Sequence, residues 1–170
     1  MVEVAISSME LAFVKRYASQ AEIGGRSAVR GADRQMTLQE DQVIGMMGNY
    51  AINKYLSGNA HSFRLSRHLI NQYPTMGDSG SDVPGLNVDI KTSLVRTELP
   101  YKRHSLVVRS AERHAQTVYV LGLVPPERDK VLLMGWAVNE ELKPITTGIF
   151  TGAWGLQADA LHPMMPLRWF

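Results

Sequence analysis

The chain of 170 residues contains no cysteine, so it can form neither disulfide bonds nor a thiolate nucleophile or metal ligand. It has no apolar run close to the roughly 20 residues that a membrane-spanning helix needs, so no membrane association is expected. The segment after Met1, VEVAISSMELAF, has no basic start and contains Glu3 and Glu10, which is not typical of a signal peptide. These absences predict a soluble, cytoplasmic protein.

Strong charge of either sign is also missing, because the formal net charge is only +2. Such a mild excess tolerates a polyanionic partner without requiring one. The sequence has no repeats, no low-complexity tract and no Walker or dinucleotide-binding fingerprint. A hydrophobic content of 45% in a chain of this length is enough for one compact core, so a single domain over 1–170 is expected.

Two segments of the first third have helical spacing. Residues 7–18 open with Ser7 and Glu10 at the separation of a capping box, and residues 37–56 carry an apolar stripe of 3.6-residue period. Gly45 and Gly48 weaken the second helix, which indicates close packing against another element.

The second half of the chain has strand-like runs separated by turn signals. A helical part followed by strands predicts an α+β fold, α/β sandwich-like, with a mixed, mostly antiparallel central sheet flanked by helices. The segment after Glu140 has no clear pattern. The expected strands are residues 86–92, 105–109, 118–124 and 130–138.

Two groups of basic residues are candidates for contact with phosphate groups, since arginine pairs well with phosphate oxygens. Each group also has a simpler interpretation as a solvated loop or turn. The first group is Arg26, Arg30 and Arg34, and the second is Arg96, Lys102, Arg103, Arg109 and Arg113.

The stretch GDSGSDVPGLNVDIKTS, residues 77–93, combines acids, a lysine and a Pro-Gly turn. In a strand, Asp89 and Lys91 would share one face, opposite the aliphatic residues between them. If Pro84 and Gly85 form the turn, Val83 pairs with Leu86 and Asp82 with Asn87, which places Asp82 on the face of Asp89 and Lys91. A slip of one residue would move Asp82 to the opposite face.

Two carboxylates beside a lysine suit metal-dependent phosphoryl transfer. Mg²⁺ prefers oxygen ligands and keeps several waters, and a nearby ammonium can orient the attacking water or help to deprotonate it. The same charges without a metal would be a surface salt bridge, worth about 0–1 kcal/mol.

GDSGSD followed by a short turn and VDIKTS resembles the core of the PD-(D/E)xK nuclease superfamily, which has the restriction-endonuclease-like fold. The resemblance implies that Asp82 and Asp89 bind Mg²⁺ or Mn²⁺, with the carbonyl of Ile90 as a further ligand, and that Lys91 is the catalytic lysine. It also implies a helical acid before the core. Glu40 matches that position, and Glu10 is the alternative.

The function expected from this resemblance is hydrolysis of DNA phosphodiester bonds by a metal-dependent endonuclease. A homodimer would provide the two sites needed to cut both strands. One alternative is a catalytically inactive nucleic-acid-binding module of the same fold, and another is a structural protein whose hairpin charges are merely hydrated.

Overall fold

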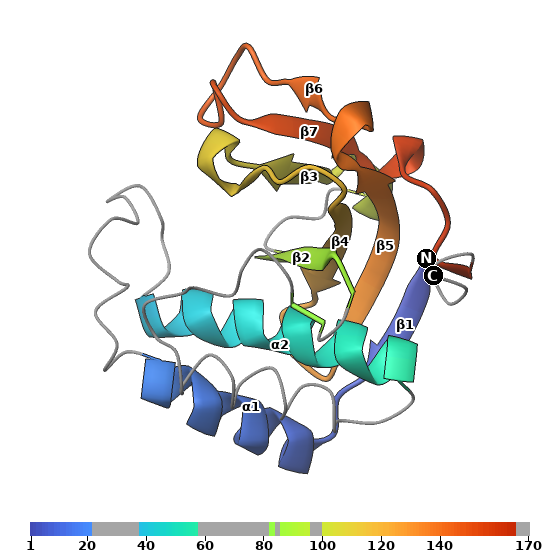
Figure 1. Cartoon of the computed structure of the whole chain (residues 1–170). Helices are drawn as coiled ribbons and strands as arrows, with labels where there is room; N and C mark the ends of the chain where they lie inside the picture. Colours follow the sequence, from blue (N-terminus) through green and yellow to red (C-terminus); the bar gives the residue numbers. More distant parts are fainter. Residues whose placement is uncertain (22–37, 58–81, 84–85, 96–99, 166–170) are drawn as a thin grey trace.

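The computed structural model describes residues 1–21, 38–57, 82–83, 86–95 and 100–165. Within these residues the protein has an α+β fold, in which two helices pack on a mixed four-stranded sheet and a small antiparallel sheet of three strands lies beyond it (Figure 1). The main elements are β1 (Val2–Ala5), α1 (Ser8–Ala21), α2 (Leu38–Ser57), β2 (Val88–Leu94), β3 (Ser105–Val108), β4 (Val118–Val124), β5 (Lys130–Val138), β6 (Lys143–Pro144) and β7 (Trp154–Gln157).

The four-stranded sheet has the order β1-β5-β4-β2. Strand β2 runs parallel to β4, whereas the other neighbouring pairs are antiparallel. Parallel neighbours need a crossover connection, and the chain between β2 and β4 provides it by passing through β3. Strand β3 pairs with β7 in the small sheet instead of joining the larger one. The predicted mixed, mostly antiparallel sheet is therefore confirmed, although it is not a simple meander.

Each face of the larger sheet has its own hydrophobic core. On one face, Val88 and Ile90 of β2 and Val120 of β4 pack with residues of α1 and α2. On the other face, Leu121 of β4 packs with Leu106 of β3 and its neighbours in the small sheet. The predicted flanking helices therefore cover one face in the described part of the chain, and the small sheet buries the second apolar face (Figure 1).

The strongly patterned elements formed where the sequence predicts them, with ends that differ by a few residues. Three short strands were not predicted. Strand β1 forms an edge through antiparallel pairing with β5, and β6 and β7 form a hairpin within the segment that had no clear pattern. Among the described helices, none combines the length and apolar character needed to cross a bilayer.

Helix α2 lies very close to β2 at Gly48. A Cβ atom at this position would come within 1.8 Å of the Thr92 Oγ1 atom and 2.9 Å of the Thr92 Cβ atom. Gly45, one turn earlier, would meet nothing within 4 Å. The predicted close packing is therefore confirmed at Gly48 and not at Gly45, and it fixes how deeply the helix seats on β2.

Gly48→Ala is expected to lower the free energy of unfolding by about 1–3 kcal/mol, because the added methyl group collides with a β-branched side chain held in a strand. Gly45→Ala is the matched control, and it should raise stability by up to about 1 kcal/mol through helix propensity. Urea denaturation of both variants measures the two effects. Equal stability of the two variants would contradict the close contact with Thr92.

Candidate active site

Asp89 and Lys91 lie on the face of β2 that is turned away from the helices. In the parallel pairing with β4 they stand opposite Tyr119 and Leu121, both of which belong to the core under the small sheet. The Lys91 Nζ atom is 2.9 Å from the Asp89 Oδ2 atom. Asp89 is only 8% exposed. The alternation of the sequence therefore predicted the placement of this pair, and the structure confirms that placement.

A second carboxylate, from Glu112, also contacts Lys91. Its Oε2 atom lies 2.9 Å from the Lys91 Nζ atom. Glu112 ends the short helix η3 (Ser110–Glu112), and the buried Tyr119 hydroxyl holds this part of the chain by donating to the Glu112 carbonyl at 3.0 Å and accepting from the His114 N–H at 2.7 Å. Sequence reasoning missed Glu112, because nothing in the local pattern connects this turn with β2.

These two carboxylates determine the charge of Lys91. Burial on its own would lower the pKa of the Lys91 ammonium, but the attraction and hydrogen bonds of Asp89 and Glu112 outweigh it and raise the pKa above the ordinary 10.5. Lys91 is therefore a cation at neutral pH. It can stabilise negative charge or donate hydrogen bonds, but in this arrangement it is poorly suited to accept a proton.

Asp82 lies against the outer edge of β2, the edge that faces away from β4. Its Oδ2 atom accepts the Ile90 N–H at 2.9 Å, and its own N–H donates to the Val88 carbonyl at 2.7 Å. Its Oδ1 atom accepts a hydrogen bond from the side-chain amide of Asn49 on α2. The carboxylate thus contacts the peptide that directly follows Asp89.

The predicted register of the hairpin is correct at the turn and wrong one residue further. Val83 and Leu86 form the expected antiparallel bridge. Asp82 then bonds to Val88 rather than facing Asn87, which is a shift of one residue. Consequently the Asp82 carboxylate lies at the strand edge beside α2, and not on the Asp89 and Lys91 face as predicted.

Two buried asparagines of α2 hold Asp82 in this place. Asn49 contacts its carboxylate, and the Asn53 Nδ2 atom donates to its carbonyl at 2.9 Å and to the Asn49 carbonyl at 2.8 Å. Both asparagines are almost fully buried. Sequence reasoning missed them, although two amides four residues apart within an apolar helix face are a usable signal, since buried polar groups need partners.

The outer edge of β2 offers oxygen atoms of the kind that Mg²⁺ binds. The N–H and C=O of a strand residue point to the same edge, so the Ile90 carbonyl faces the side on which Asp82 bonds the Ile90 N–H. The Asp82 carboxylate, the Ile90 carbonyl and the Asp89 carboxylate all provide oxygen atoms, which fit a hard divalent cation. The described residues contain no group of three or more acidic, histidine or cysteine side chains that could hold a metal. Any ion here would therefore depend on main-chain, water and substrate oxygens as well.

Glu40 does not join this group. It lies in the first turn of α2 and pairs with Arg128 of the β4–β5 turn, at 3.2 Å between Oε1 and an arginine nitrogen. Asn49, the residue of α2 that contacts Asp82, is nine residues further along, or about 13 Å of helix. The expectation that Glu40 assists Asp82 and Asp89 is therefore not supported by its position.

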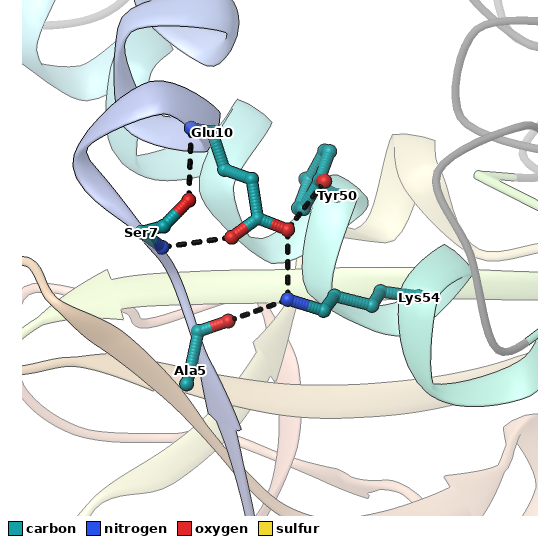
Figure 2. Close-up of polar contacts among 5 residues, drawn as sticks. All are labelled: Ala5, Ser7, Glu10, Tyr50 and Lys54. Atoms are coloured by element: carbon teal, nitrogen blue, oxygen red, sulfur yellow. Dashed lines mark hydrogen bonds and ion pairs between the residues drawn. The ribbon is translucent and has the colours of Figure 1, made fainter.

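Glu10, the alternative helical acid, is engaged elsewhere (Figure 2). It forms the predicted capping box with Ser7 at the start of α1, and its Oε1 atom accepts hydrogen bonds from Tyr50 and Lys54 of α2, both at 2.7 Å. Lys54 also donates to the Ala5 carbonyl at 2.9 Å. Glu10 thus joins β1, α1 and α2, on a different side of α2 from Asn49.

The predicted DNA-contacting residues are only partly described. Lys102 and Arg103 are exposed in the short helix η2 (Tyr101–Arg103). Arg113 is used within the fold, where it bonds to Asn139 at 2.8 and 3.0 Å and lies 3.8 Å over the Trp154 ring. The predicted residues outside the described part of the chain are Arg26, Arg30, Arg34 and Arg96.

Comparison of the chain with protein families, with curated proteins and with solved structures finds no match.

The Glu10 contacts predict a pH-dependent contribution to stability. Burial raises the pKa of Glu10, but the hydrogen bonds from Lys54, Ser7 and Tyr50 outweigh it and lower the pKa from 4.5 to about 2. A lowered pKa in the folded state means that this contribution is complete above pH 4.5 and is lost as the pH falls toward 2.

Glu10→Gln should therefore lower the free energy of unfolding by about 1–2 kcal/mol at pH 7, and the difference from the unmodified protein should shrink below pH 4.5. Urea denaturation at pH 7 and at pH 3 measures this change. The exposed Glu140→Gln is the control and should have little effect at either pH. A difference between Glu10→Gln and the unmodified protein that stays constant over this range would refute the account of Glu10.

Proposed function

We propose that the protein is a metal-dependent endonuclease that hydrolyses DNA phosphodiester bonds and belongs to the restriction-endonuclease-like class. The observation that carries this proposal is the arrangement around one peptide of β2. The peptide joins Asp89 to Ile90. Asp89 forms an ion pair with Lys91, and the Asp82 carboxylate accepts the Ile90 N–H at the strand edge. Two carboxylates and an ammonium, gathered around one strand, are the kinds of group that metal-assisted phosphate hydrolysis uses.

The candidate ligands for Mg²⁺ or Mn²⁺ are the carboxylates of Asp82 and Asp89 and the carbonyl of Ile90, with waters and a phosphate oxygen filling the remaining positions. When bound, such an ion supplies a nucleophilic water at neutral pH and offsets charge on the phosphate. Asp82 and Asp89 then act as anchors that orient the ion against a strand whose other face is packed under α2.

In this proposal Lys91 provides electrostatic stabilisation. It is held as a cation between Asp89 and Glu112, so it can approach the phosphate and offset the negative charge that grows as the phosphodiester bond breaks. Its raised pKa favours this role over that of a general base. Glu112 is then a positioning residue, which helps to hold the ammonium in place.

The DNA substrate is proposed from charge and from exposure. Lys102 and Arg103 are exposed cations on the turn that leads into β3, the strand of the small sheet that covers the Asp89 and Lys91 side. Cations that face solvent can neutralise backbone phosphates and release counterions. Cutting of both strands would be provided by a homodimer.

The alternative is a nucleic-acid-binding module of the same fold without catalytic turnover. The observation that favours it is that the described residues contain no group of three acids that could hold a metal, since Glu40 and Glu10 are engaged elsewhere and Glu112 is paired with Lys91. Such a module would bind DNA with strong salt dependence and leave it intact.

Purified protein incubated with plasmid DNA should cleave it in Mg²⁺ or Mn²⁺ and not in EDTA. Asp89→Asn and Lys91→Ala should each lower the cleavage rate by roughly a hundredfold or more, since each removes a group that acts on the reacting phosphate. Asp129→Asn and Lys130→Ala are matched controls, because they lie at the β4–β5 turn and should cleave like the unmodified protein.

Metal-dependent cleavage that survives in both Asp89→Asn and Lys91→Ala would rule out the proposed site. Salt-sensitive DNA binding without any cleavage in either metal would support the inactive module instead. Far-ultraviolet circular dichroism of each variant checks that lost activity does not reflect lost folding.

A further inference from the structure

The loop between β6 and β7 exposes two large apolar side chains at its tip. Ile149 is 89% exposed and Phe150 is 47% exposed. Isolated apolar residues on a surface are common, but adjacent ones at the tip of a projecting loop mark an interaction site more often. Figure 1 shows this loop at the end of the small sheet that lies far from α1 and α2.

The tip has a defined conformation. The Ala153 N–H donates to the Phe150 carbonyl at 3.0 Å, and both the N–H and the hydroxyl of Thr151 donate to the Gly148 carbonyl, at 3.2 and 2.7 Å. Gly148 and Gly152, on either side of the tip, have φ angles of 81° and 88°, which favour glycine. The backbone therefore turns sharply at both ends and holds Ile149 and Phe150 outward.

The chain segments around the tip contain cations, and Glu112, which follows one of them, is paired with Lys91. Residues 100–111 and 142–158, which form the small sheet and the turns next to it, contain no aspartate or glutamate. An unbalanced positive surface next to exposed apolar side chains suits a polyanion that also offers an apolar interior. The exposed cations of these residues are Lys102, Arg103, Arg109 and Lys143.

The tip is also connected to the candidate active site. The Ser110 hydroxyl donates to the Gly152 carbonyl at 2.6 Å, next to the tip. Ser110 begins the short helix η3, and Glu112 at its end contacts Lys91 at 2.9 Å. The short helix η3 therefore links the β6–β7 loop to Lys91. Figure 1 shows η3 beside this loop.

We propose that the β6–β7 loop inserts Ile149 and Phe150 between stacked base pairs of duplex DNA, while Arg109 and Lys143 contact the phosphates on either side. This inference rests on the proposed function for its DNA substrate, and it adds the element that grips and deforms that substrate. Apolar wedges of this kind unstack a base step from the minor groove and kink the duplex. The link to Lys91, through Ser110 and Glu112, favours DNA over a lipid surface.

The test uses the full chain in EDTA, so that binding is measured without cleavage. The duplexes carry 2-aminopurine at a different position in each. The fluorescence of 2-aminopurine should rise on protein binding in those duplexes where the base step next to it is unstacked. Ile149→Ala/Phe150→Ala should bind roughly tenfold more weakly and should lose this signal at saturation, since stacking on an aromatic side chain is lost. Met9→Ala, which removes an apolar side chain that is 82% exposed on α1, is the matched control and should behave like the unmodified protein.

A second variant separates the wedge from the cations. Arg109→Ala/Lys143→Ala should weaken binding and lower the slope of log K against log salt by about two, because two phosphate contacts are lost. The 2-aminopurine signal at saturation should remain. Phe150→Ala alone, which changes the loop least, should give an intermediate loss of the signal.

Unchanged DNA affinity and an unchanged 2-aminopurine signal in Ile149→Ala/Phe150→Ala would overturn the proposal. Loss of binding to anionic vesicles by this variant, with its DNA binding intact, would also overturn it and would assign the tip to a membrane surface. The two proposals fail separately. Tip-dependent unstacking without cleavage in Mg²⁺ or Mn²⁺ refutes only the nuclease, whereas cleavage that does not depend on the tip refutes only the wedge.

Discussion

Strand β2 lies at the edge of the four-stranded sheet and is covered on both faces, and this position determines what its polar residues can do. Val88 and Ile90 pack under α2, and Gly48 lets that helix come close enough to touch Thr92. Because neighbouring side chains in a strand point to opposite faces, burial of the aliphatic residues directs Asp89 and Lys91 to the other side. Helix packing on one face of β2 thus positions a charged pair on the opposite face.

The charges of this region hold one another in place. A partly buried ammonium needs partners, and Lys91 has the carboxylates of Asp89 and Glu112. Asp82 closes the outer edge of β2 through Ile90 and Asn49. A carboxylate oxygen has two lone pairs, so the same oxygen can accept a hydrogen bond and coordinate a cation. The structural and the proposed catalytic uses of this residue are therefore compatible.

Local patterns in the sequence predicted what depends on local physics. The helical stripes and the period-two alternation of β2 gave the elements and the shared face of Asp89 and Lys91, because each pattern follows from the geometry of one segment. Contacts between distant segments were not predictable. The parallel pairing of β2 with β4, the contact of Glu112 with Lys91 and the pairing of Glu40 with Arg128 depend on how the chain crosses the sheet. The shift at Asp82 arose because amides of α2 draw this residue to the strand edge.

The proposed function requires the outer edge of β2 to form one divalent-cation site with the carboxylates of Asp82 and Asp89. The most direct test is a crystal structure of the protein with Mn²⁺, located by its anomalous scattering. The account predicts one Mn²⁺ ion with an oxygen of Asp82 and an oxygen of Asp89 both at about 2.2 Å. A structure in which Asp82 keeps its hydrogen bonds to Ile90 and Asn49, with no ion at this edge in millimolar Mn²⁺, would contradict the proposed site.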